Sequence, residues 1–265
     1  MRHAPRRIAR FVSKIRDGVP EVDVSEQDGV RSLHLGSNTV QSSMLVAAPF
    51  DLEVTYTRGM MCFLLFTKVA KTVLVIGLGG GSIPKFIHHY MPEIHTTSVE
   101  LNPAVIEAAH NQFFLPPNDE RLEVIAADGA VYIAERMETH DVIMLDAYDS
   151  KGLAEDLSSQ SFYDHCQRAL TADGILVVNL WGSDKNFDLY VQRMQHSFDG
   201  AVLILPTGHP GNIAVFAFKR HAGDLRLVSL RERAKKLEAN LKVEFGEFLK
   251  RLIDYNVHSV NRLIV

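Results

Sequence analysis

The chain has 265 residues, 46% of them hydrophobic, which is enough for one large α/β domain with a substantial core. Its net charge is −4, but residues 17–218 hold 26 acidic residues against 11 Lys and Arg, which argues against a nucleic-acid groove and is compatible with a cationic small substrate. No apolar run reaches the roughly 18 residues that span a bilayer, and two cysteines without a CxxC pair fit a reducing, cytoplasmic setting.

Two parts are predicted before residue 71. Residues 1–19 form a basic segment, which we interpret as solvated chain. Residues 20–70 form a small β-rich portion with a hairpin around positions 36–38, where Gly and Asn favour a turn.

Residues 71–220 alternate β-rich runs with helical stretches, which predicts βαβ units and a parallel sheet covered on both faces. Candidate helix caps between the runs are Asn102 with Pro103, Ser158 or Ser159, and Asp184. The last two runs, AVLILP and NIAVFAFK, are separated only by TGHPG, which is too short for a helical crossover and predicts an antiparallel hairpin at the sheet edge.

Residues 221–265 have the apolar spacing of one or two amphipathic helices, which we expect to cover the core or a partner subunit. The predicted fold is therefore α/β, with a seven-stranded and mostly parallel sheet, a small N-terminal β portion and C-terminal helices. This strand pattern resembles the class I S-adenosylmethionine-dependent methyltransferase sheet.

A glycine cluster follows the first run of this region, in VLVIGLGGGSIPKFI. Gly77, Gly79, Gly80 and Gly81 lie between a predicted strand and a predicted helix. Glycine there either makes a tight turn or lets a ligand lie against bare backbone at a helix N-terminus. The cluster alone leaves both interpretations open.

Acidic residues end the next three predicted strands. Glu100 ends the second and Asp128 the third, where they can accept hydrogen bonds from ribose hydroxyls and from the exocyclic amine of adenine. Asp146 and Asp149 follow the fourth strand, and two close carboxylates can hold a cationic amine and take its proton. As alternatives, these acids could be surface residues, helix caps or loop supports. Together the strand ends favour a nucleoside site.

Several segments resemble the spermidine synthases, which are polyamine aminopropyltransferases. They are VLVIGLGGGS, SVELNPAVIEAA, ERLEVIAADGAVYI, DVIMLDAYD and SFYDHCQRALTADGILVV, and the resemblance covers roughly residues 30–220. It implies transfer of the aminopropyl group of decarboxylated S-adenosylmethionine to a di- or polyamine, with release of methylthioadenosine. No metal is expected.

The resemblance also assigns residues. On the acceptor side, Asp146 would accept the amine proton, Asp149 would orient the attacking amine, and Tyr56 would bind the amine. The co-substrate site would comprise Gln41, the glycines at 77, 79 and 81, Glu100 at the ribose, and Asp128 with Gly129 at the adenine.

Three departures from the family pattern lie near the expected acceptor. Gly80 replaces an aspartate that anchors the aminopropyl amine, which weakens the discrimination against intact S-adenosylmethionine. Arg58 replaces an acidic partner and would repel a diamine or pair with a cofactor carboxylate. The final hairpin, TGHPGN, lacks the aromatic residues often found there, and its His209 is either a catalytic base or, as is more usual for a turn histidine, simply exposed.

These departures keep two alternatives open. One is a methyltransferase that uses intact S-adenosylmethionine. The other is a protein without catalytic activity that binds a nucleoside or a protein partner. For an aminopropyltransferase we expect a small-molecule amine substrate, together with no nucleic acid or membrane partner and a homodimer.

Overall fold

The computed structural model describes residues 21–67, 70–149, 152–208, 211–220 and 222–265. The predicted basic segment 1–19, His209 and the side chain of Asp149 lie outside this description. No helix in the part of the chain described is both long and apolar enough to cross a bilayer.

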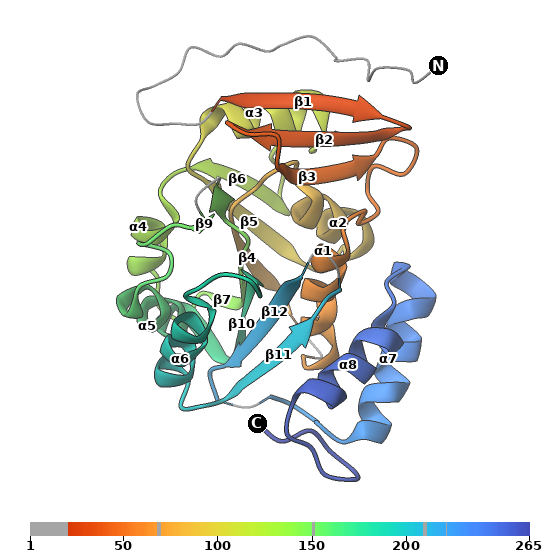
Figure 1. Ribbon diagram of the computed structural model, residues 1–265, viewed down its shortest axis with the longest axis vertical. Coiled ribbons are helices and arrows are strands. Elements are labelled where there is room, and N and C mark those ends of the chain that lie inside the picture. The colour runs from red at the N-terminus through yellow and green to blue at the C-terminus, as the bar shows by residue number, and fades with distance from the viewer. Residues whose placement is uncertain (1–20, 68–69, 150–151, 209–210, 221) are drawn as a thin grey trace.

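A seven-stranded sheet forms the centre of the molecule (Figure 1). In spatial order its strands are β11 (Val202–Pro206), β12 (Asn212–Phe218), β10 (Leu170–Trp181), β7 (His140–Leu145), β4 (Thr72–Ile76), β5 (His95–Glu100) and β6 (Leu122–Ala126). The strands from β10 to β6 pair in parallel, whereas β12 pairs antiparallel with both β10 and β11. The predicted mostly parallel sheet and its terminal hairpin are therefore confirmed.

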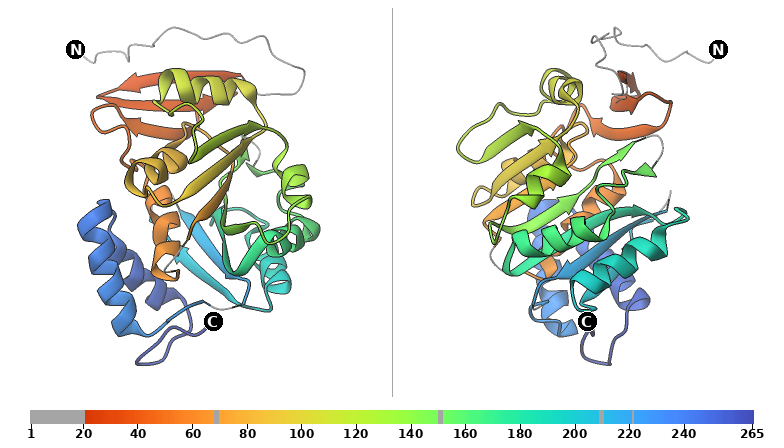
Figure 2. Two further views of the ribbon diagram at one scale, coloured as in Figure 1. Left: turned by 180° about the vertical axis from the view of Figure 1, so that it is seen from behind. Right: turned by 90° about the vertical axis from the view of Figure 1, so that its left-hand side faces the viewer.

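Helices cover both faces of this sheet because successive strand residues point to opposite sides. Val73 and Val75 of β4 pack in one core, whereas Leu74 and Ile76 pack in another. The first core is covered by α1 (Thr55–Met60), the 3-10 helix η1 (Met61–Leu65), α2 (Ser82–Tyr90), α7 (Leu227–Leu241) and α8 (Phe245–Tyr255). The second is covered by α4 (Gly129–Ala134), α5 (Gln160–Ala169) and α6 (Phe187–Ser197), and Figure 2 shows the two helical layers on opposite sides.

Two of the predicted helix caps are present. The Asn102 side chain accepts a hydrogen bond from the backbone of Ala104 at the start of α3 (Pro103–Gln112), and Ser159 accepts one from Phe162 N at 3.2 Å. The prediction for Asp184 was wrong. Its carboxylate accepts from Asn186 N at 2.8 Å, which fixes the turn before α6 rather than the helix itself.

The N-terminal part is a three-stranded antiparallel sheet of β1 (Val22–Gln27), β2 (Val30–Leu35) and β3 (Val40–Leu45). It lies above the central sheet and shares a core with α3, through residues such as Leu33 and Phe113 (Figure 1). Residues 55–65 are helical, so strands occupy only the first part of the predicted β-rich portion. The shared core fixes β3 over the ends of β4 and β5.

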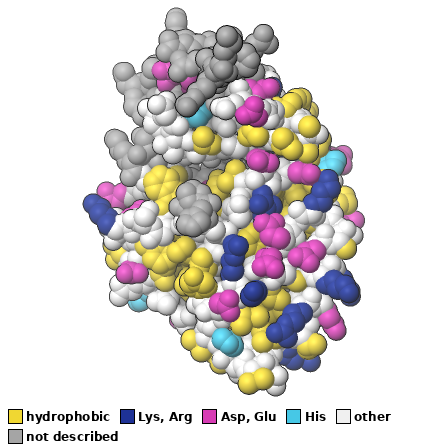
Figure 3. Space-filling view, turned by 45° about the vertical axis from the view of Figure 1, so that its right-hand side comes forward, with side chains coloured by type: hydrophobic (Ala, Val, Ile, Leu, Met, Phe, Trp, Pro, Cys, Tyr) yellow, Lys and Arg dark blue, Asp and Glu magenta, His cyan; other side chains and the backbone are white. Residues whose placement is uncertain are grey.

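The C-terminal helices α7 and α8 pack on the α1 side of the sheet. Leu230, Phe245, Phe248 and Leu252 are buried there against η1 and the hairpin of β11 and β12. On the face drawn in Figure 3, acidic and basic side chains are interspersed. The predicted amphipathic helices therefore cover the core of their own chain.

Candidate active site

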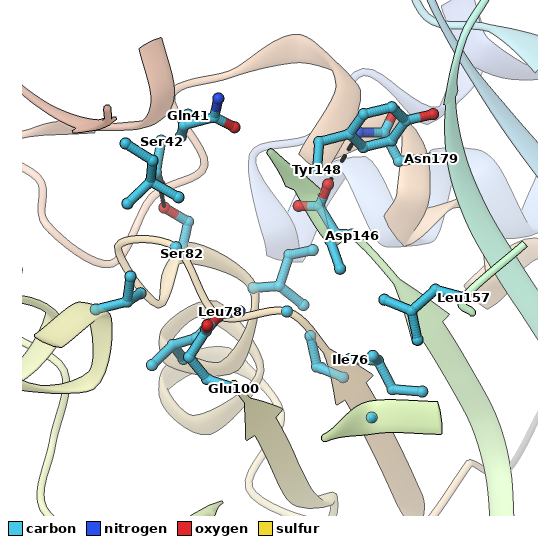
Figure 4. Close-up of a pocket in the computed structure, with 18 of the residues that line it drawn as sticks. Gln41, Ser42, Ile76, Leu78, Ser82, Glu100, Asp146, Tyr148, Leu157 and Asn179 are labelled. Carbon is cyan, nitrogen blue, oxygen red and sulfur yellow. Dashed lines mark hydrogen bonds between the residues drawn. The ribbon is translucent and has the colours of Figure 1, made fainter. Parts of the chain in front are cut away.

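A pocket of about 740 Å³ opens at the carboxyl ends of β4, β5 and β7, under the edge of β3. This is the edge where parallel α/β sheets bind ligands, and the volume suits a nucleoside with a second small molecule. Figure 4 shows Gln41 and Glu100 on one side of the space and Asp146, Tyr148 and Asn179 on the other.

Gly77 begins the glycine loop and allows the closest backbone approach in the pocket wall. Its φ is +93°, and a Cβ atom there would lie 2.2 Å from the backbone oxygen of Asp146. Any side chain would therefore push the β7 strand end away from β4. Glycine at this position is what brings the loop and Asp146 together.

Glu100 fixes the loop from the end of β5. One carboxylate oxygen accepts from Leu78 N at 3.0 Å and the other from Asn102 N at 2.8 Å. Burial raises the pKa of this carboxyl group, and the backbone hydrogen bonds oppose that shift. Each oxygen keeps a further lone pair, so Glu100 can still accept bonds from two neighbouring hydroxyls of a ligand.

Asp128 lies at the rim of the pocket, at the N-cap of α4. Its Oδ1 accepts from Ala130 N at 2.8 Å and from Val131 N at 3.3 Å. It therefore caps a helix and also lines the pocket. Gly129 next to it packs against Ile76, since a Cβ atom there would lie 2.4 Å from the Ile76 side chain.

Gln41 on β3 provides a polar group without a partner. Its Nε2 atom is buried, and no acceptor for it is found among the residues described. Leaving a buried amide donor unpaired is costly, so the site is suited to a ligand that carries an acceptor there. Gln41 lines the same pocket as Glu100, as predicted for a shared co-substrate site.

Asp146 is the buried centre of the opposite wall. Its Oδ2 accepts from the Tyr56 hydroxyl at 3.2 Å, and its Oδ1 accepts from Asn179 Nδ2 at 2.9 Å. Burial raises the pKa of Asp146, and the two donors oppose this. The group is thus a carboxylate held in one orientation beside the pocket, with the properties of a general base.

Asn179 and an aromatic wall were missed in the sequence. Tyr148 and Trp181 stack at 4.6 Å between ring centroids, and the Tyr148 hydroxyl accepts from Trp181 N at 3.1 Å. Both rings line the pocket, where an aromatic face can hold a cation. The only Trp of the chain, in VVNLW at a strand end, is the signal that could have found this wall.

Arg58 does not line the pocket, so the expectation that it would repel a diamine or pair with a cofactor carboxylate was wrong. Its guanidinium pairs with Glu244 at 3.0 Å and donates to the backbone oxygens of Leu52 and Glu53. The partner lies 186 residues along the chain, at the start of α8. The Glu244 carboxylate therefore neutralises the Arg58 guanidinium, which is not available to a ligand in the pocket.

Two glycines of the loop lie behind the pocket wall. A Cβ atom at Gly80 would lie 2.8 Å from the Phe113 ring, and one at Gly81 would lie 2.9 Å from Leu115. Neither residue is among those that line the pocket, whereas Gly77 and Gly79 are. The contribution of Gly81 is its φ of +70° at the N-cap of α2.

Comparison with known proteins identifies the family. Residues 53–219 match the model of the spermine/spermidine synthase domain. The chain belongs to this family. A polyamine aminopropyltransferase of Chromobacterium violaceum is 39% identical over 256 residues, which cover 97% of this chain and 98% of that protein.

Two further comparisons bear on fold and chemistry. A crystal structure of spermidine synthase with the transition state analogue AdoDATO has a TM-score of 0.73 at 22% identity, covering 92% of this chain and 85% of that one. An eEF1A lysine and N-terminal methyltransferase of Xenopus laevis is 33% identical over 189 residues, covering 67% of this chain and 27% of that protein. This chain has the fold of that spermidine synthase.

Proposed function

We propose that the protein is an aminopropyltransferase that moves the aminopropyl group of decarboxylated S-adenosylmethionine to a di- or polyamine. The observation that carries the proposal is the buried Asp146 carboxylate, which accepts two hydrogen bonds. It faces a pocket whose opposite wall has side chains suited to a nucleoside. Family membership supports the same reaction.

The nucleoside part of the co-substrate would lie along the glycine loop. Glu100 would accept bonds from the ribose hydroxyls, and Gln41 Nε2 would donate to an acceptor of the ligand. Asp128 and Gly129 at the rim would meet the adenine. This arrangement leaves the sulfonium between the loop and Asp146.

The reaction is a displacement at the methylene carbon bound to sulfur. The bound ammonium first gives one proton to Asp146, which frees the lone pair on nitrogen. The nitrogen then attacks the aminopropyl carbon, the C–N bond forms to give a secondary ammonium product, and the C–S bond breaks with its electron pair going to sulfur, which leaves a neutral thioether. The Tyr148 and Trp181 rings would hold the cationic amine close to this carboxylate. Asp149, the last residue of the short strand β8 (Tyr148–Asp149), stays a proposed second carboxylate for the amine.

We also propose that the protein forms a homodimer. Tyr255, Val257 and Val260 are apolar side chains exposed near the C-terminal helices, and Val260 is 92% exposed. Apolar groups at one end of a molecule favour association. Light scattering after size exclusion would measure the mass directly.

Methyl transfer from intact S-adenosylmethionine is a second candidate, favoured by one observation. The part of the glycine loop that lines the pocket, Gly77 to Gly79, carries no acidic side chain. A carboxylate there would repel the carboxylate of intact S-adenosylmethionine, so its lack removes a barrier to that ligand. The similarity to a lysine and N-terminal methyltransferase, whose acceptors are also amines, supports this candidate.

Calorimetric titration with each form of the sulfonium compound tests the two candidates. Each titration is followed by mass spectrometry after incubation with putrescine. Tighter binding of the decarboxylated form and an amine heavier by one aminopropyl unit support aminopropyl transfer. Binding of the intact form without an aminopropylated product overturns it in favour of methyl transfer.

A further inference from the structure

A row of side-chain hydrogen bonds crosses three neighbouring strands at the pocket edge. Asn212 is the first residue of β12, and its Nδ2 donates to Asn179 Oδ1 on β10 at 3.0 Å. Asn179 Nδ2 in turn donates to Asp146 Oδ1, just beyond β7, at 2.9 Å. Asn179 and Asn212 are 3% and 8% exposed, so water does not compete freely for these bonds.

The chemistry of the three groups fixes the direction of the row. An ionised carboxylate only accepts hydrogen bonds, so Asn179 must present its NH₂ group to Asp146. Its carbonyl oxygen then points away and is satisfied by a donor, which Asn212 supplies. The reverse orientation would place a carbonyl oxygen against the carboxylate.

We propose that Asn212 is a positioning residue, which acts through Asn179 to hold the Asp146 carboxylate ionised and in one orientation toward the bound amine. This inference rests on the proposed function, in which Asp146 accepts the amine proton. Asn212 needs no contact with the reacting atoms, because its effect passes through one intervening amide. The hydrogen bond from Tyr56 fixes the other carboxylate oxygen from the opposite side.

The side chain of Asn212 can be changed without opening the hairpin that carries it. Thr207 donates to the backbone oxygen of Asn212 through both its N–H and its hydroxyl, each at 2.9 Å. These bonds use only the main chain of Asn212. A substitution there therefore separates the amide row from the fold of β11 and β12.

The described titratable groups that face Asp146 are Tyr56 and Tyr148. Burial raises the pKa of both phenols, and the nearby Asp146 charge raises them further. Both therefore stay protonated at neutral pH. Among the described residues Glu100, on the other side of the pocket, also has a pKa raised by burial, so the difference in the acidic limb between variant and wild type is what reports on Asp146.

The test is the pH profile of kcat/KM in Asn212→Asp and Asn212→Leu. In Asn212→Asp, a variant of nearly the same shape, the new carboxylate competes for the Asn179 NH₂ group. We expect the midpoint of the acidic limb to rise by about one pH unit. Below that midpoint kcat/KM should fall tenfold, and it should recover at higher pH. The uncharged Asn212→Leu should move it in the same direction by less, which excludes a purely Coulombic effect. The KM for the sulfonium substrate should stay within twofold.

Thr207→Val is the matched control, because it removes a hydroxyl bond to the same backbone oxygen and leaves the amide row intact. Its profile should keep the wild-type midpoint. A loss in the Asn212 variants that is equal at every pH would mean a structural contribution only and would overturn the proposal, as would unchanged profiles.

A measurement without turnover separates this inference from the proposed function. The titration of carboxyl carbons in ¹³C-aspartate-labelled protein, assigned with Asp146→Asn, should give a higher midpoint for Asp146 in Asn212→Asp than in wild type. A shifted midpoint in a protein that alkylates no amine would defeat the proposed function alone. An active wild type with equal midpoints in the two proteins would defeat the inference alone.

Discussion

The two sides of the pocket are built in different ways. On the side proposed for the nucleoside, carboxylates are fixed by backbone N–H groups that are close by in the sequence or in the loop after the neighbouring strand, as for Glu100 with Asn102 and Leu78. On the acceptor side, Asp146 is fixed by side chains from α1 and β10, which lie 90 and 33 residues away. The first side depends on main-chain geometry, and the second on side chains that substitutions can remove singly.

This difference predicts how each side fails when it is changed. Substitutions on the acceptor side should reduce the rate of transfer and leave nucleoside binding intact. Substitutions at the glycine loop or Glu100 should weaken nucleoside binding or the fold itself.

Asp146→Asn should have the largest effect, a loss of about 10³ in kcat, because a positioned base contributes about 10² to 10⁴ to such a reaction. Single-turnover measurements with saturating amine would give the rate. Calorimetry should show methylthioadenosine bound within twofold of wild type. Weaker binding of the nucleoside in this variant would contradict the separation of the two sides.

Gly77→Ala should lower the free energy of unfolding by about 3 kcal/mol or more, since its Cβ would overlap the backbone of Asp146 at a φ of +93°. Urea denaturation measures this. Gly29→Ala is the matched control, because its φ of +78° is also positive but no atom of the described residues lies within 4 Å of the new Cβ. It should cost only about 1 kcal/mol. Equal losses would show that the close approach at Gly77 is unimportant.

Glu100→Gln should weaken methylthioadenosine binding by about 30-fold, because a hydrogen bond to a charged group contributes about 1.5 to 3 kcal/mol. Its KM for the amine should change by less than twofold. Calorimetry and steady-state kinetics give the two values. A larger change in the amine KM would place Glu100 on the acceptor side.

Tyr56→Phe should lower kcat/KM by about tenfold at pH values below the midpoint of the acidic limb. The Tyr56 hydroxyl opposes the rise in the pKa of Asp146 that burial causes, so its removal raises that pKa further. More Asp146 is then protonated at a given pH, and the acidic limb of the profile moves to higher pH. Activity should recover as the pH is raised. A tenfold loss that persists at high pH would instead indicate lost contact with the amine.

Most of the fold was predictable because its signals are local. Alternating apolar residues, the short TGHPG connection and the caps at Asn102 and Ser159 each act over a few residues. The same holds for the strand-end carboxylates, since parallel strands bring their ends to one edge. Asp184 shows the limit of such local prediction, because an aspartate is favoured both in turns and at helix N-caps, and here it fixes a turn.

Consecutive residues alone encode the sheet, its terminal hairpin and the strand-end carboxylates that line the pocket, since strand periodicity and glycine loops are local patterns. Only the tertiary structure decided that Arg58 turns to Glu244, that Gly80 lies against Phe113, and that Asn212 reaches Asp146 through Asn179. The physical reason is that a charged or polar side chain binds the partner that packing brings near, and the position of that partner along the chain carries no local signal.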